Sequence, residues 1–93
     1  MENETLKLFL KEKIVELKKL PYQELCQFMD NAKTEKYGEG DSFYQIEVSS
    51  FWDDGKGETK NLRVVASVDN GGARAFFLPF TEDFIITPDG RFI

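Results

Sequence analysis

The sequence predicts an α+β domain in which two N-terminal helices pack on one face of a three- to five-stranded antiparallel β-meander. Two observations predict this fold class. Apolar residues recur at helical spacing in the first third of the chain, and they alternate with polar residues in the remainder. Because a chain of 93 residues builds one hydrophobic core, we expect a single domain over residues 1–93.

The first helix is predicted over Thr5–Leu20, with Thr5 as its N-cap. Leu8 and Val15 fall on the side of this helix opposite to its main apolar stripe. The stripe itself repeats at steps of three and four and consists of Leu6, Phe9, Leu10, Ile14, Leu17 and Leu20. One face of the helix is therefore expected to pack on the core, and a second, smaller apolar surface is left over.

A second helix is predicted to start with Pro21 at its first position, where a missing N–H costs nothing. Tyr22, Leu25, Cys26 and Met29 continue the helical spacing to about residue 31. Glycines at 38 and 40 among polar residues then predict a loop over residues 32–42. The helical part is thus expected at about residues 5–31 and the meander at about 43–93.

The second half predicts strands separated by glycine-rich turns. A first strand alternates Tyr44, Ile46, Val48 and Trp52 with polar residues, and a second alternates Leu62, Val64, Ala66 and Val68. The Asn70-Gly71 pair is a strong hairpin signal, so a third strand over Ala73–Phe80 is expected to pair with the second. A last short hairpin is predicted around Pro88-Asp89-Gly90, between residues 84–87 and 91–93.

The third predicted strand is apolar on both faces, so one layer of helices cannot cover all of it. The length of the loop decides which of the two alternating sets of side chains in this strand faces away from the helices. A loop of Asn70 and Gly71 alone places one set there, and a loop that includes Gly72 as a bulge places the other set there. The bulged register is preferred because it buries Phe76, Leu78 and Phe80. In both registers a valine, a phenylalanine and Arg63 remain on the uncovered face, unless the C-terminal segment Phe84–Ile93 folds across it.

Composition disfavours several classes of function. The formal charge of −5 argues against nucleic-acid binding, which uses clustered positive charge. The chain has no histidine and one cysteine, Cys26, so we expect no catalytic residues, no metal site and no cofactor, with Cys26 as a core thiol. A lone cysteine and the lack of a long apolar run favour a cytoplasmic protein that does not enter a membrane.

We therefore expect a small binding domain that acts through self-association, such as a homodimer, or through a protein partner. The candidate partner-binding residues are Phe51, Arg63, Val65 and Phe77, because apolar and arginine side chains together are typical of interface centres. Two alternatives remain open. One is a small-ligand-binding or enzymatic domain with a pocket between helices and sheet, for which Glu24 and Glu47 are the carboxylates to inspect. The other is an acidic inhibitor or immunity-type protein.

Some turns of the second half resemble those of small bacterial proteins. The resemblance covers only that half of the chain and implies no activity. The stretches that carry it are Phe51-Trp52-Asp53-Asp54, Val68-Asp69-Asn70-Gly71-Gly72, Arg74-Ala75-Phe76 and Pro88-Asp89-Gly90.

Overall fold

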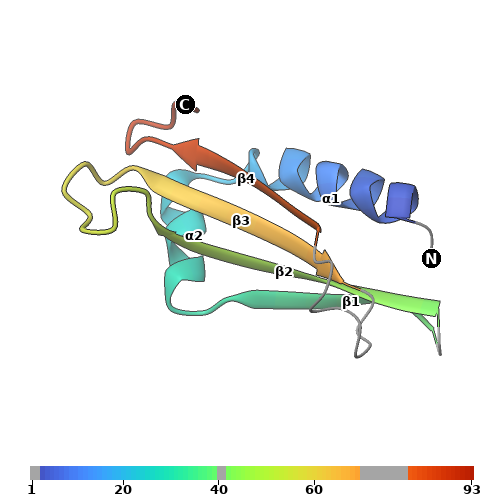
Figure 1. Cartoon of the computed structure of the whole chain (residues 1–93). Helices are drawn as coiled ribbons and strands as arrows, with labels where there is room; N and C mark the ends of the chain where they lie inside the picture. Colours follow the sequence, from blue (N-terminus) through green and yellow to red (C-terminus); the bar gives the residue numbers. More distant parts are fainter. Residues whose placement is uncertain (1–2, 40–41, 70–79) are drawn as a thin grey trace.

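The computed structural model describes residues 3–39, 42–69 and 80–93. In these residues two helices and a short 3-10 helix precede four antiparallel strands, which confirms the predicted α+β class (Figure 1). The elements are α1 (Asn3–Leu17), α2 (Tyr22–Cys26), the 3-10 helix η1 (Gln27–Met29), β1 (Lys33–Glu39), β2 (Ser42–Trp52), β3 (Leu62–Asp69) and β4 (Phe80–Ile86).

Each strand pairs with its neighbour in sequence, so the sheet is a meander of order β1-β2-β3-β4. Val48 of β2 lies opposite Ala66 of β3, and Val64 of β3 lies opposite Phe84 of β4. This register brings the apolar side chains of three strands to one face, which we call the inner face. The predicted strands over residues 44–52 and 62–68 are confirmed.

The helices pack on the inner face and form the core with it. Helix α1 packs against β3 and β4, whereas α2 and η1 pack against β2. The alternate residues Leu62, Val64, Ala66 and Val68 of β3 are fully buried, and they meet Leu6, Leu10, Leu17 and Leu25 of the helices. Each buried leucine or valine contributes about 1.5–3 kcal/mol through removal of apolar surface from water, so this face holds the fold together.

The helix boundaries differ from the predictions at three points. Helix α1 begins at Asn3 and ends at Leu17, so Thr5 lies inside it and does not cap it. The sequence predicts Pro21 at the first position of the second helix, but Pro21 is the N-cap of α2 and has an extended conformation. Its carbonyl oxygen accepts hydrogen bonds from the backbone N–H groups of Glu24 and Leu25. The second helix tightens into η1 before residue 31.

The prediction of a loop over residues 32–42 is wrong because β1 occupies most of it. The inner-face residues of β1 are Lys33, Glu35 and Tyr37, which lie opposite Val48, Ile46 and Tyr44 of β2. A polar edge strand shows no apolar alternation, and charged residues on an edge strand also discourage pairing with other chains. The Tyr37 ring stacks on the Tyr44 ring with centroids 5.1 Å apart.

The predicted pairing of residues 62–68 with Ala73–Phe80 is also wrong. Strand β3 pairs with β2 along one edge and with residues 80–86 of β4 along the other. This pairing buries Phe84 and Ile86 under α1. The Asn70-Gly71 turn, both alternative registers of the third strand and Phe77 lie outside the described residues.

The predicted C-terminal hairpin is confirmed. The Thr87 backbone N–H donates to the Arg91 carbonyl oxygen at 2.8 Å, and the Ile93 N–H donates to the Ile85 carbonyl oxygen at 2.9 Å. The Phe92 ring meets the Phe84 ring edge to face, on the side of the sheet that α1 covers. The segment after β4 therefore runs along the edge of the sheet and does not fold across the other face.

A buried hydrogen bond links the second helix to the sheet. The hydroxyl of Ser50, which is 6% exposed, donates to the Leu25 carbonyl oxygen at 2.8 Å. We expect Ser50→Ala to lower the free energy of unfolding by about 1–2 kcal/mol, because the carbonyl loses a buried donor. Urea unfolding followed by Trp52 fluorescence measures this loss. The control is Ser49→Ala on the opposite face, which should change stability by less than about 0.5 kcal/mol; equal losses would contradict the role of the bond.

Candidate functional site

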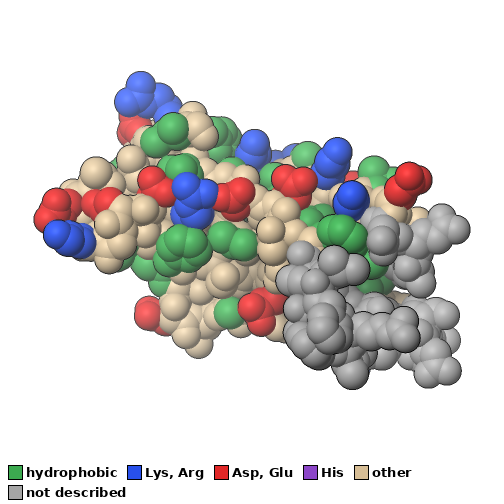
Figure 2. Space-filling view, in the orientation of Figure 1, with side chains coloured by type: hydrophobic (Ala, Val, Ile, Leu, Met, Phe, Trp, Pro, Cys, Tyr) green, Lys and Arg blue, Asp and Glu red, His purple; other side chains and the backbone are tan. Residues whose placement is uncertain are grey.

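The face of the sheet away from the helices, which we call the outer face, carries a row of three neighbouring side chains. Arg63 of β3 lies between Phe51 of β2 and Ile85 of β4 in the sheet register. The Phe51 side chain is 48% exposed, although its neighbour Ser50 is buried. Over the strands, Figure 2 shows hydrophobic surface interspersed with basic and acidic side chains. An aromatic side chain is thus presented to solvent from β2, an interior strand of the hydrogen-bonded sheet.

Arg63 is held in place by two carboxylates. Its Nη2 lies 2.8 Å and its Nε 3.0 Å from Oδ1 of Asp53, and its Nη1 donates to Asp83 across the pair with β4. Hydrogen bonds from the guanidinium to Asp53 and then Asp83 raise the pKa of Arg63 above its ordinary value. Because two carboxylates flank one guanidinium, this part of the outer face carries an excess negative charge.

The structure brings together three of the four candidate partner-binding residues. Phe51, Arg63 and Val65 share the outer face, with Val65 two residues further along β3 and opposite Asp83. Phe77 lies outside the described residues. Sequence reasoning missed Ile85, although the run Phe84-Ile85-Ile86 carried the signal: in a strand, the middle residue of an apolar triplet points away from the other two.

The loop that presents Asp53 is organised around the neighbouring carboxylate. Asp54 accepts the backbone N–H groups of Lys56, Gly57 and Thr59, the last at 3.0 Å. The bond from Thr59, followed by those from Gly57 and Lys56, lowers the pKa of Asp54. These contacts fix the turn between β2 and β3, so the position of Asp53 beside Arg63 is set by the loop.

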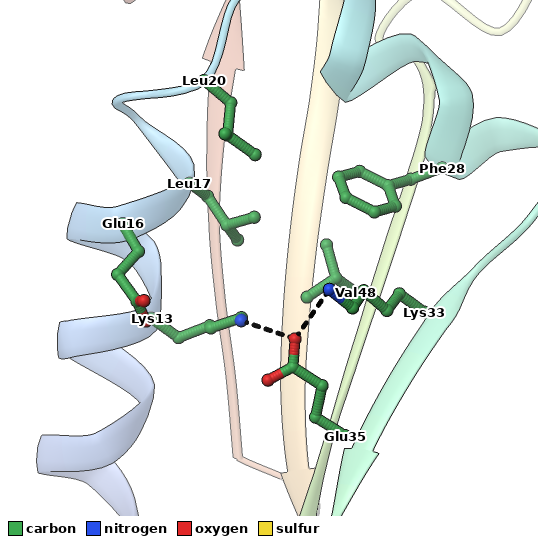
Figure 3. Close-up of a pocket in the computed structure, with 8 residues that line it drawn as sticks. All are labelled: Lys13, Glu16, Leu17, Leu20, Phe28, Lys33, Glu35 and Val48. Atoms are coloured by element: carbon green, nitrogen blue, oxygen red, sulfur yellow. Dashed lines mark hydrogen bonds and ion pairs between the residues drawn. The ribbon is translucent and has the colours of Figure 1, made fainter.

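A second candidate site is a cavity of about 310 Å³ on the opposite side of the sheet. We call it the β1 cavity; it is lined by Lys13, Glu16, Leu17, Leu20, Phe28, Lys33, Glu35 and Val48. Figure 3 shows the C-terminal half of α1 on one side and Phe28 and Lys33 on the other, with the two lysine side chains reaching toward Glu35 from opposite directions. The cavity exists where the helical layer ends above β1.

Four polar residues at the β1 cavity form what we call the Glu35 network. One oxygen of Glu35 lies 3.0 Å from the Lys13 ammonium nitrogen and 3.1 Å from that of Lys33, while the other accepts the Tyr37 hydroxyl. The bond from Tyr37 and then that from Lys13 lower the pKa of Glu35 to about 2. The hydrogen bond from Tyr37 to Glu35, together with burial, raises the pKa of Tyr37 to about 12. Glu35 is thus ionised and Tyr37 protonated across the neutral range.

The other candidate groups lie outside the row of Phe51, Arg63 and Ile85 and do not line the β1 cavity, although Glu47 shares the outer face with that row. Glu24 and Glu47 are exposed, and Cys26 is partly buried against the core. Within residues 3–39, 42–69 and 80–93, no group of three or more cysteine or carboxylate residues is placed to hold a metal ion. None of the helices in that part of the chain is long and apolar enough to cross a membrane.

Comparison of the chain with protein-family models, with curated proteins and with solved structures finds no match. Any assignment of function therefore depends on the two sites themselves.

The Glu35 network predicts a specific pH dependence of stability. The folded-state pKa of Glu35, about 2, lies below the ordinary value of 4.5. The contribution of Glu35 to stability is therefore complete above pH 4.5 and is lost as the pH falls through about 2. Glu35→Gln should lower the free energy of unfolding by about 1–2 kcal/mol at neutral pH and by much less near pH 2. Urea unfolding of both proteins at several pH values measures the difference. A difference that does not change with pH, or an equal loss in the exposed control Glu24→Gln, would contradict this role.

The loop between β2 and β3 predicts unequal effects of two matched glycine substitutions. Gly55 and Gly57 both have φ of +75°, but a Cβ at Gly57 would lie 2.9 Å from the Trp52 ring, whereas one at Gly55 would meet nothing within 4 Å. We expect Gly55→Ala to cost about 1 kcal/mol from backbone strain alone and Gly57→Ala to cost more, with a change in Trp52 fluorescence. Thermal unfolding compares the two; equal losses would show that the ring gives way freely.

Proposed function

We propose that this chain is a non-catalytic binding domain that docks a protein partner through its outer face. The observation that carries the proposal is Phe51, which is 48% exposed and lies opposite Arg63 in the sheet. Interface centres are enriched in aromatic residues and arginine. Ile85, which lies opposite Arg63 on β4, and Val65, two residues further along β3, extend this surface. The lone Cys26 fits a reducing compartment and so favours a cytoplasmic role.

The charges around this surface indicate the chemistry of the partner. Arg63 is already matched by Asp53 and Asp83, and Glu47 is exposed on the same face. A partner that places an apolar side chain against Phe51 would therefore gain most from lysine or arginine at its rim. An acidic inhibitor that masks a basic protein surface is one specific form of this function.

A second copy of the chain fits this surface less well. In a symmetric dimer through the outer face, the same carboxylates would approach one another, and like charges oppose association. We therefore expect a monomer when size-exclusion chromatography is combined with light scattering at high protein concentration. A stable dimer that Phe51→Glu dissociates would instead identify the partner as a second copy.

The partner is tested by placing a photo-crosslinking amino acid at position 51 in cells that produce the protein. The control carries the same amino acid in place of Val15, an apolar position on α1 that is 56% exposed and therefore at least as accessible as Phe51. We expect position 51, and not position 15, to crosslink one protein with a basic surface. That protein is then purified and titrated, and Phe51→Glu should weaken binding at least about tenfold, as for a central interface residue. The absence of a crosslink specific to position 51 would contradict the proposal.

A further inference from the structure

The β1 cavity has two ends of different chemistry. One end is apolar and is formed by Leu17, Leu20, Phe28 and Val48, whereas the other end carries Lys13, Lys33 and Glu35. Small-molecule sites in proteins typically combine an apolar wall with a few polar groups that fix the orientation of the ligand. The volume of about 310 Å³ corresponds to on the order of ten water molecules of liquid. The cavity is therefore large enough for a small organic molecule.

The hydrogen bonds of the Glu35 network decide which charge the cavity accepts. Both oxygens of Glu35 already accept bonds, from Lys13 and Lys33 on one oxygen and from Tyr37 on the other. Each lysine ammonium has three donors and gives one of them to Glu35. The lysines of the cavity thus have donors left for a ligand, whereas both oxygens of Glu35 are already engaged.

The positions of the two ammonium groups also favour an anion. Because both lie within hydrogen-bond distance of the same Glu35 oxygen, they are close enough for one carboxylate to bridge them. Lys13 is only 12% exposed, so its charge is less screened than that of a surface lysine. Glu16 also lines the opening, but its side chain is exposed to solvent and its opposing charge is more strongly screened.

We propose that the β1 cavity binds a small amphipathic carboxylate, with its head group between Lys13 and Lys33 and its apolar tail against Leu17, Phe28 and Val48. This site is independent of the outer face, since its lining comes from the inner face and from the helices. No covalent step is involved.

Octanoate is a suitable probe because it has on the order of ten non-hydrogen atoms, which matches the cavity volume. Titration into the isotopically labelled protein, followed by backbone amide chemical shifts, should move the signals of Leu17, Phe28 and Val48 with a dissociation constant of about 1 mM or lower. Octylamine has the same tail with a cationic head, and it should bind at least about tenfold more weakly. Equal shifts with both compounds, or shifts centred elsewhere in the chain, would overturn the proposal.

Two matched lysine substitutions test the head-group site. Lys33 lines the cavity with a side chain that is 59% exposed, so Lys33→Met should preserve the fold and weaken octanoate binding at least about threefold. Lys19→Met removes an exposed lysine of the same type that does not line the cavity, and it should leave the affinity unchanged. An equal effect of the two substitutions would show only general attraction of the anion to a basic surface and would refute the assigned site.

Discussion

The structure depends on one geometric constraint: the layer of helices is narrower than the sheet on which it packs. Helix α1 covers β3 and β4, and the short unit of α2 and η1 covers β2. The core is complete there because Leu62, Val64, Ala66 and Val68 of β3 have no exposed surface. The inner face of β1 and the whole outer face must be stable without a helical layer above them. Their side chains are therefore more polar and more exposed than the buried side chains of β3.

At β1 the sequence replaces apolar side chains with an ionic network. Lys13 extends from α1 to Glu35 of β1, and Tyr37 continues the contact by stacking on Tyr44. A carboxylate that is partly removed from water and lacks partners would be costly. The Glu35 carboxylate instead accepts hydrogen bonds from three donors, on Lys13, Lys33 and Tyr37. The network therefore connects the edge strand to the helix at the place where apolar packing ends, and the space left between them is the β1 cavity.

These differences explain how far the sequence could be interpreted. Strands β2 and β3 were predictable because one face of each is buried and their residues alternate accordingly. Strand β1 was not, because its inner-face residues Lys33, Glu35 and Tyr37 show no apolar alternation and contact one another and Lys13 of α1 instead. The Asn70-Gly71 turn signal predicts a partner for β3 in the residues that follow it directly, whereas β3 pairs with β4, whose Phe84 and Ile86 are buried under α1. Arg63 and Val65 share a face because period-two alternation decides this within one strand, and Phe51 joins them because it lies opposite Arg63 in the register.

The two sites share strand β2 but not its side chains. Val48 points into the β1 cavity, while Phe51, which faces away from the helices, is on the outer face. Because neighbouring residues of a strand point to opposite sides, a ligand in the cavity and a protein on the outer face would not compete for space. Any coupling between them would have to pass through the backbone of β2 and β3, whose inner side chains are tightly packed. Since no side chain is common to the β1 cavity and the row of Phe51, Arg63 and Ile85, the two binding events are expected to be independent.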